Sequence, residues 1–214
     1  MNKGNAYDNS VELYEEWFIE NNNILDTEIQ IIKDLLPDSA EGIEIGVGTG
    51  IFSFRLGIKH GVEPAKRMRQ KAIDRGIEVT AAYAENLPIA SESYKFALMV
   101  TVDCFLEDVI KAFREVWRIL DDDGFFIIAF LDRETPLGTL YDHNKHSDSF
   151  YGNANFNSAK EIEEYLLKTG FYDIEKKQTI YTLDNISQEI KTGTGEGVFA
   201  VFKAKKQEGF NFTI

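Results

Sequence analysis

The stretch Ile43-Glu44-Ile45-Gly46-Val47-Gly48-Thr49-Gly50 decides the fold class of this chain. Its first three residues predict a buried strand, and the alternating glycines that follow predict a tight turn into a helix. Glycines at such a turn let backbone amides approach a ligand closely, and the start of the next helix favours an anionic group. The stretch therefore predicts a cradle for a small molecule at the first strand-to-helix turn of an α/β sheet.

The spacing of the glycines separates two classes of ligand. The dinucleotide-binding pattern G-x-G-x-x-G, read from Gly46 and Gly48, needs a glycine at position 51, where this chain has Ile51. A glycine turn by itself also occurs as an ordinary tight turn in α/β proteins. The ligand must therefore be assigned from the segments that follow.

The segment 59–64 predicts a short second strand that ends in an acidic residue, Glu63. In an open α/β sheet the carboxyl end of such a strand faces the ligand crevice, where a carboxylate can accept hydrogen bonds from both hydroxyls of a ribose. The alternative is a solvated acidic residue at the start of a helix that begins with Pro64. We expect Glu63 to bind a ribose.

Three segments together resemble the class I S-adenosylmethionine-dependent methyltransferases, in the small-molecule form known as the methyltransferase type 11 domain. The acidic residue and G-x-G-x-G of 44–50 are similar to motif I of that family. Residues 83–88, Tyr-Ala-Glu-Asn-Leu-Pro, are similar to its adenine-side segment, and residues 114–124 to the segment before its fifth strand. The resemblance is close over about residues 40–131. It departs at Ala97, where an aspartate is usual, and at 122–123, where relatives often have Pro-Gly.

The resemblance implies S-adenosylmethionine as the cofactor and assigns roles to residues of this chain. The turn glycines would admit the methionine and ribose end, an acidic residue would lie near the ammonium group, and the adenine-side segment would contact the base. An aromatic residue of the N-terminal segment would close the site. The expected cofactor-binding residues are Glu44, Gly46, Gly48, Gly50, Glu63, Ala84, Glu85, Leu87 and Tyr14.

The order of predicted elements agrees with the fold that the resemblance implies. This fold is a doubly wound, seven-stranded Rossmann-like sheet, mostly parallel with the last strand antiparallel beside the fifth, and with helices on both faces. Apolar spacing predicts helices at 24–36 and 106–120, and a capping box of Ser158 and Glu161 predicts a helix ending near Gly170. Further strands are expected at 77–81, 95–102, 124–131, 171–177 and 198–205.

We expect one domain of 214 residues with four parts. Residues 1–39 form an N-terminal helical cap, and 40–131 form the cofactor-binding core. Residues 132–157 form a long loop, rich in aromatic and polar residues, on the acceptor side of the sheet. Residues 158–214 supply a C-terminal helix and strands.

The catalytic residues stay unassigned, with His143, His146 and Asp103 as candidates. A histidine could serve as a general base near neutral pH, and Asp103 could orient the acceptor or simply form a turn. His143 and His146 are three positions apart, yet no cysteine or Glu-x-x-His partner accompanies them, so we expect no metal site. Cys104 matches no methyltransferase nucleophile motif and is expected to be buried.

Composition restricts the partners. The formal net charge of −13, from 36 acidic and 23 basic residues, repels nucleic acid and anionic lipid. No apolar run approaches the roughly 20 residues of a membrane span. A single cysteine suits a reducing compartment. We therefore expect a cytoplasmic protein that acts on neither nucleic acid nor membranes, while its oligomeric state stays open.

The sequence thus predicts methyl transfer from S-adenosylmethionine to a small-molecule acceptor, neutral or cationic, bound under residues 132–157. Two alternatives remain at this point. A non-catalytic sensor or scaffold that binds S-adenosylmethionine would keep the same motifs. An NAD-dependent dehydrogenase would share the first strand-helix-strand unit, although Ile51 and the expected antiparallel last strand disfavour it.

Overall fold

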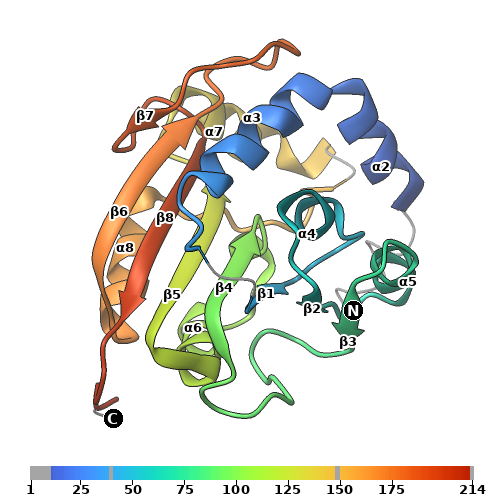
Figure 1. Ribbon diagram of the computed structural model, residues 1–214. Helices are drawn as coiled ribbons and strands as arrows, with labels where there is room; N and C mark the ends of the chain where they lie inside the picture. Colours follow the sequence, from blue (N-terminus) through green and yellow to red (C-terminus); the bar gives the residue numbers. More distant parts are fainter. Residues whose placement is uncertain (1–10, 39–40, 148–149, 213–214) are drawn as a thin grey trace.

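The computed structural model describes residues 11–38, 41–147 and 150–212 and contains one mixed sheet in the order β3-β2-β1-β4-β5-β8-β6-β7 (Figure 1). The strands are β1 (Gly42–Ile45), β2 (His60–Val62), β3 (Glu78–Thr80), β4 (Tyr94–Val100), β5 (Leu120–Leu131), β6 (Phe171–Thr179), β7 (Lys191–Thr192) and β8 (Phe199–Lys206). Strands β1 to β5 pair in parallel, and β8 lies antiparallel between β5 and β6. The predicted seven-stranded, mostly parallel sheet with its last strand antiparallel beside the fifth is confirmed, and the short β7 is an additional edge strand.

Helices cover both faces of the sheet (Figure 1). The helices α2 (Val11–Glu20), α3 (Asn22–Lys33) and α4 (Ile51–Leu56) pack on one face, and α6 (Val109–Ile119) and α8 (Ala159–Lys168) pack on the other. Strand β4 alternates between the two cores, because Phe96 and Leu98 join the first cluster while Ala97 and Met99 join the second. This alternation is the period of two that buries a central strand on both faces.

Local signals explain where several elements begin. Helix α6 begins at Val109 rather than at the predicted Leu106, because the Asp108 side chain accepts a hydrogen bond from the Lys111 amide and caps the helix there. Ser158 and Glu161 form the predicted capping box of α8. Strand β5 begins four residues before the predicted Gly124, with a register shift where it passes Tyr94 and Phe96.

The segment 132–157 is helical over residues 136–147, where the sequence predicts a loop. It contains α7 (Pro136–Asn144) and a 3-10 turn, η2 (Lys145–Ser147). Helix α7 begins here because Pro136 occupies the first helical position and the Thr135 hydroxyl accepts a hydrogen bond from the Gly138 amide. A Cβ at Gly138 would lie 1.9 Å from the Asp132 carbonyl oxygen, so this turn requires glycine.

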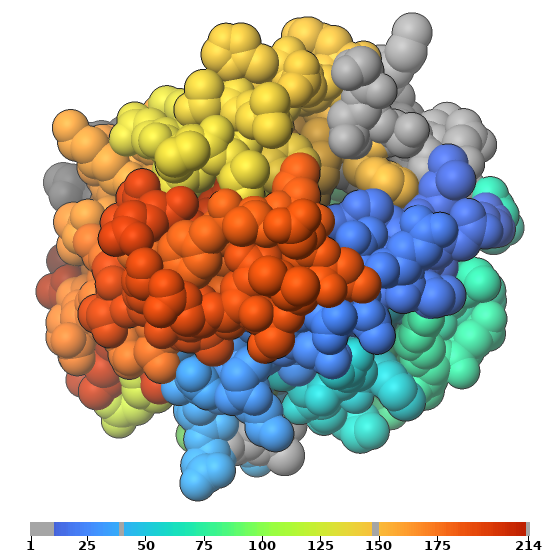
Figure 2. Space-filling view, turned by 90° about the horizontal axis from the view of Figure 1, so that it is seen from above, coloured from blue at the N-terminus to red at the C-terminus, as the bar shows by residue number. Residues whose placement is uncertain are grey.

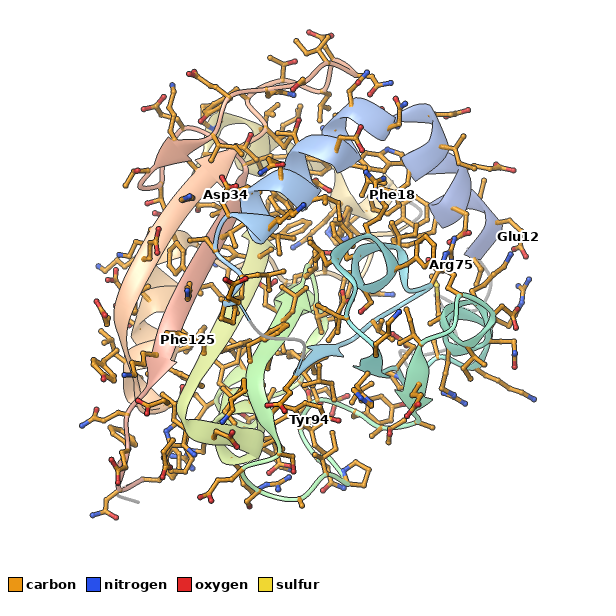
Figure 3. All side chains as sticks on the ribbon, viewed as in Figure 1. Glu12, Phe18, Asp34, Arg75, Tyr94 and Phe125 are labelled. Carbon is orange, nitrogen blue, oxygen red and sulfur yellow. The ribbon has the colours of Figure 1, made fainter. Side chains whose placement is uncertain are left out.

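The N-terminal helices are linked to the half of the sheet that carries the glycine turn. Arg75 follows α5 (Lys66–Asp74) and points toward α2 (Figure 3). Its guanidinium donates to Glu15 on α2 at 2.6 Å and to the carbonyl oxygen of Thr49 in the glycine turn at 2.6 Å. One side chain therefore links the helical cap to the turn that the sequence predicts as the ligand cradle.

A second covering segment, residues 180–190, lies beside α3 at the surface (Figure 2). Asn185 in this segment accepts a hydrogen bond from the Asn23 amide at 2.9 Å and donates one to the Glu20 carbonyl oxygen at 2.7 Å. Three segments that are distant in the sequence therefore cover the carboxyl edge of the sheet. They are helices α2 and α3, helix α7, and residues 180–190. No helix in the described ranges is long and apolar enough to cross a bilayer.

Candidate functional site

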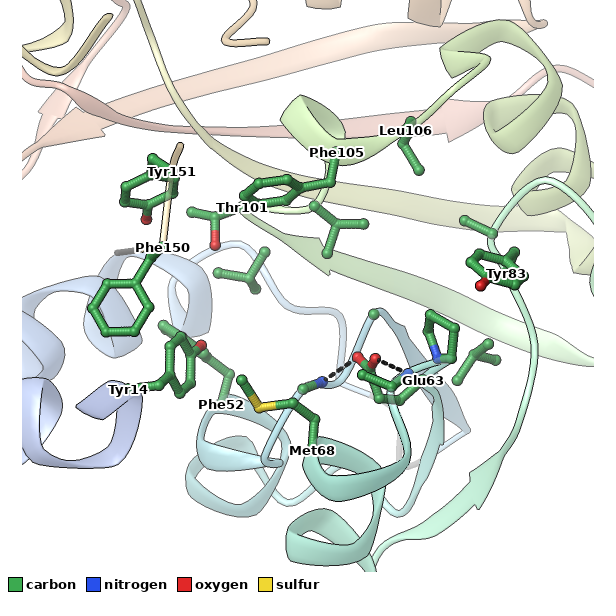
Figure 4. Close-up of a pocket in the computed structure, with 18 of the residues that line it drawn as sticks. Tyr14, Phe52, Glu63, Met68, Tyr83, Thr101, Phe105, Leu106, Phe150 and Tyr151 are labelled. Atoms are coloured by element: carbon green, nitrogen blue, oxygen red, sulfur yellow. Dashed lines mark hydrogen bonds between the residues drawn. The ribbon is translucent and has the colours of Figure 1, made fainter. Parts of the chain in front are cut away.

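A cavity of about 890 Å³ lies at the carboxyl edge of the parallel strands. This volume is near the upper end of the roughly 300–1,000 Å³ found for small-molecule sites, which leaves room for two ligands side by side. Figure 4 shows Tyr14, Phe150 and Tyr151 gathered on one side and Glu63 and Tyr83 on the other. The cavity therefore has an aromatic half and a half formed by the predicted cofactor segments.

Two of the three motif glycines reach the cavity. Gly46, Gly48 and Gly50 have φ values of +75°, +55° and +83°, a region that L side chains rarely adopt. A Cβ at Gly46 would meet the Val102 side chain at 2.4 Å, whereas a Cβ at Gly48 would meet nothing within 4 Å. Since Gly48 lines the cavity, a side chain there would enter the ligand space.

Gly50 has a packing role. It is absent from the cavity wall, and a Cβ there would lie 2.5 Å from the Ile77 side chain and 3.0 Å from the Ala72 backbone. The glycine therefore lets the start of α4 approach α5 closely. The structure does not bring Gly50 together with the other two motif glycines at the ligand space.

Glu63 is held in a defined orientation beside Gly48. Its carboxylate accepts a hydrogen bond from the Gly48 amide at 3.0 Å through Oε2 and one from the Ala65 amide at 2.7 Å through Oε1 (Figure 4). The side chain is 8% exposed and lines the cavity. Hydrogen bonds from backbone amides favour the charged form of a carboxylate.

Glu44 and Asp103 are buried and lie outside the cavity wall. Glu44 accepts a hydrogen bond from the Ser53 hydroxyl, and burial raises its pKa to about 8. Asp103 accepts a hydrogen bond from the Asn157 amide at 2.9 Å, and burial raises its pKa to about 6. Both side chains hydrogen-bond to neighbouring polar side chains, and neither lines the cavity.

The adenine-side segment is only partly at the cavity. Ala84 and Glu85 line it, and the Glu85 carboxylate accepts a hydrogen bond from the Glu107 amide at 2.9 Å. Leu87 is buried elsewhere, and its amide donates to Glu115 at 2.7 Å.

Glu115 and Arg118 hold this adenine-side segment in place. Arg118 donates to the carbonyl oxygens of Leu87 at 2.9 Å and Ile89 at 2.7 Å, and its Nε donates to Glu115 at 2.8 Å. The sequence identifies the segment 114–124 by resemblance only. In the structure, Glu115 and Arg118 of this segment hydrogen-bond to residues 87–89. They fix the loop that lines the cavity.

The aromatic half of the cavity comes from α2, η1 (Asp103–Phe105) and the segment 132–157. Tyr14 lines it and makes edge contacts with Phe18 at 5.0 Å and Phe150 at 5.9 Å between ring centroids. Burial and the nearby carboxylates of Glu44, Glu28 and Glu63 raise the pKa of Tyr14 well above its usual range. The surroundings of Tyr14 therefore disfavour a negative charge on its ring oxygen.

Glu28 is a lining residue that the sequence reasoning missed. It lies on α3, is 8% exposed and faces the cavity. The signal was present, because Glu28 interrupts the apolar stripe of Leu25, Ile29 and Ile32 at a position that the helical period directs inward.

The two candidate histidines lie away from the cavity. His143 and His146 are exposed at the end of α7 and in η2, and neither lines the cavity. The His143 ring nitrogen Nδ1 lies 2.8 Å from the Thr139 carbonyl oxygen of its own helix. Within the described residues, no group of three His, Cys, Asp or Glu side chains is placed to hold a metal ion. Cys104 is buried, as predicted.

Comparison with known proteins agrees with this geometry. A methyltransferase domain model matches residues 43–128. A crystal structure from Thermotoga maritima, described as a SAM-dependent methyltransferase and possible histamine N-methyltransferase, is 42% identical, covers 95% of this chain and 99% of its own, and superposes with a TM-score of 0.90.

Two relatives extend the comparison. An uncharacterized protein of Methanocaldococcus jannaschii is 41% identical over 204 residues, which are 94% of this chain and 99% of that protein. A malonyl-[acyl-carrier protein] O-methyltransferase of Geobacter sulfurreducens is 25% identical over 187 residues, 80% of this chain and 70% of that enzyme. These matches agree with the fold, which has the glycine turn, the fixed Glu63 carboxylate and the mixed sheet described above. The chain belongs to the class I S-adenosylmethionine-dependent methyltransferases.

Proposed function

We propose that the protein transfers the methyl group of S-adenosylmethionine to a small molecule bound in the aromatic half of the cavity. The observation that carries this proposal is the division of one cavity into two halves. The Glu63 and Gly48 side suits the methyl donor, and the Tyr14 and Phe150 side suits an acceptor beside it. This proposal assigns Tyr14 to the acceptor side, whereas the sequence predicts that it binds the cofactor. A formal net charge of −13 disfavours a polyanionic acceptor.

The donor side fits S-adenosylmethionine residue by residue. Gly48 leaves an open face where the methionine and ribose end would lie, and the Glu63 carboxylate would accept hydrogen bonds from the ribose hydroxyls. Ala84 and Glu85 would contact the adenine. Gly46 keeps the turn close to Val102, while Gly50, Glu44 and Leu87 support the turn and loop from outside the cavity.

The chemistry needs little from the protein beyond placement. The sulfonium of the bound donor supplies an activated methyl group. The protein then has to hold the acceptor in line and exclude water, which the buried aromatic half of the cavity would do. His143 and His146 are exposed outside the cavity, so we assign them no catalytic role.

The acceptors in the descriptions of these two relatives differ in chemistry. The Thermotoga protein is described with a small amine, and the Geobacter enzyme with a carboxylate on a carrier protein. These names leave the acceptor atom open. They also give no support to the NAD-dependent alternative.

A labelling experiment tests the proposed function. We expect label from methyl-labelled S-adenosylmethionine to appear in a pool of small metabolites and not in added RNA or protein. Chromatography of the separated pools measures this. Label found only in RNA or protein would refute the small-molecule acceptor, and label found nowhere, with donor binding intact, would favour the sensor alternative.

Substitution of Gly48 tests the donor side of the cavity. We expect Gly48→Ala to weaken binding of S-adenosylhomocysteine about tenfold, because the new methyl group enters the ligand space. Calorimetric titration measures the affinity. Gly57→Ala is the matched control, since Gly57 also has a positive φ with nothing within 4 Å of a Cβ but lies outside the cavity wall.

Both of these alanine variants carry a backbone strain of about 1–2 kcal/mol, so both should unfold at a lower temperature than the original protein. Only Gly48→Ala should lose affinity. Equal affinities in the two variants would mean that Gly48 does not face the donor.

A further inference from the structure

Glu28 is a buried acid in the cavity wall that the donor-binding residues do not use. Its side chain is 8% exposed, and it has no hydrogen-bond or ion-pair partner among the residues that the structure describes. Carboxylates are almost never buried unless they are paired. A lining carboxylate without a protein partner indicates that a ligand supplies the partner.

The surroundings of Glu28 select a cation. Burial raises its pKa to about 8, and no neighbouring cation acts to lower it. The carboxylates of Glu44, Glu28 and Glu63 all act on Tyr14 and raise its pKa. A positively charged group bound near Tyr14 would therefore be stabilised by these acidic side chains, whereas an anion would be repelled.

The aromatic rings that line the same cavity as Glu28 suit a cation with an apolar body. Phe105 and Tyr151 stack with ring centroids 6.2 Å apart, and Tyr141 meets Tyr151 edge-on at 5.9 Å. These three residues line the same cavity as Tyr14 and Trp17. Aromatic faces attract ammonium groups and also bury apolar groups, so they bind both parts of such a ligand.

We propose that Glu28 binds the amino group of the methyl acceptor, which is a small amine with an aromatic or otherwise apolar body. This inference rests on the proposed function, because it names the acceptor class for the aromatic half of the cavity. It assigns to Glu28 a direct contact with the substrate.

The proposed step balances in atoms and charge. The carboxyl group of Glu28 is protonated below about pH 8 in the ligand-free protein, and it releases this proton to solvent as the ammonium group of the acceptor enters. The resulting carboxylate accepts a hydrogen bond from the ammonium group and then takes a proton from it, which leaves a lone pair on nitrogen. That lone pair forms the new C–N bond as the C–S bond of the donor breaks and its electron pair stays on sulfur. The positive charge lost by the sulfonium appears on the methylated nitrogen, and Glu28 keeps the proton. A buried carboxylic acid with a raised pKa is closer in basicity to an amine than a solvated one, which eases the proton transfer.

Binding of amine probes to the protein saturated with S-adenosylhomocysteine tests the inference without turnover. The probes are 2-phenylethylamine and histamine, each beside the alcohol that carries a hydroxyl in place of the amine. We expect at least one amine to bind about 10- to 100-fold more tightly than its alcohol, and Glu28→Gln to remove this preference. Glu16→Gln, the same chemical change at an exposed site on α2, should keep it.

The outcomes separate this inference from the proposed function. Glu28→Gln should bind S-adenosylhomocysteine normally, which also shows that it is folded, and Glu28→Met is the second variant if it does not fold. Failure of the original protein to bind S-adenosylhomocysteine would overturn the proposed function. Normal binding of S-adenosylhomocysteine with no amine preference, or with a preference that survives in Glu28→Gln, would overturn the role of Glu28 alone. A Glu28→Gln variant that folds but loses S-adenosylhomocysteine instead of the amine would assign Glu28 to the donor and would also overturn it.

Discussion

Replacement of Glu63 by alanine is expected to weaken binding of S-adenosylhomocysteine by roughly 30- to 150-fold, or about 2–3 kcal/mol. The carboxylate is fixed by the Gly48 and Ala65 amides, so it would bind the proposed ribose hydroxyls without a further loss of side-chain freedom. Calorimetric titration of both proteins with S-adenosylhomocysteine measures the difference.

A structural effect of the same substitution has to be separated from a loss of ribose contacts. Glu63→Ala also leaves the Gly48 and Ala65 amides without their acceptor, so the unfolding temperature without ligand should be measured beside the affinity. Glu78→Ala serves as the control, because Glu78 is an exposed acid at the start of the neighbouring strand β3. An unchanged affinity in a folded Glu63→Ala protein would move the ribose contact to another residue.

The free energy of unfolding of the ligand-free protein is expected to fall as pH rises from about 5 to 8. Burial raises the pKa of Glu28 to about 8, while in the unfolded chain it returns to its ordinary value of 4.5. Between these two values the folded state holds a proton that the unfolded state releases, so stability decreases with pH. For this one carboxyl group the loss is on the order of 3 kcal/mol. Glu44, whose pKa burial also raises to about 8, acts in the same direction.

Denaturant titrations at about pH 5 and pH 8 measure this dependence. Glu28→Gln removes the ionisable group without changing the shape of the side chain, so the variant should be more stable than the original protein at pH 8 and should lose part of the slope. Glu16→Gln should leave the slope unchanged, because that side chain is exposed. A Glu28→Gln protein with the original pH dependence would show that Glu28 stays ionised when buried.

Much of the fold could be predicted from short-range signals. The alternation along β4 follows from a sheet buried on both faces, and the positive φ values of Gly46 and Gly48 follow from a turn that only glycine adopts easily. Ser158 and Glu161 cap α8 through groups three residues apart. Such signals act within one or two turns of chain, so they can be read before any tertiary contact is known.

Helix α7 shows where local reading was insufficient. Thr135 and Pro136 form a recognisable helix start, yet the polar and aromatic residues after them lack a clear apolar stripe, and the segment was predicted as a loop. Its position depends on Gly138 meeting the Asp132 carbonyl oxygen and on Tyr141 packing against Tyr151 and Phe156. These contacts join residues that the sequence alone does not bring together.

The sequence predicts, through its resemblance to the methyltransferases, the mostly parallel sheet with an antiparallel last strand. It also predicts that Glu63 and Gly48 face the same crevice, because they belong to consecutive elements of one strand-helix-strand unit. Which of the predicted residues line the cavity depends on the tertiary contacts. Gly50, Glu44 and Leu87 lie outside the cavity wall, and His143 and His146 are exposed. Glu28, which is not among the predicted residues, lines the cavity. The burial of a side chain such as Glu28 requires α2, α3 and the segment 132–157 to pack together over the edge of the sheet. These contacts join residues far apart in the sequence, so no local pattern predicts them.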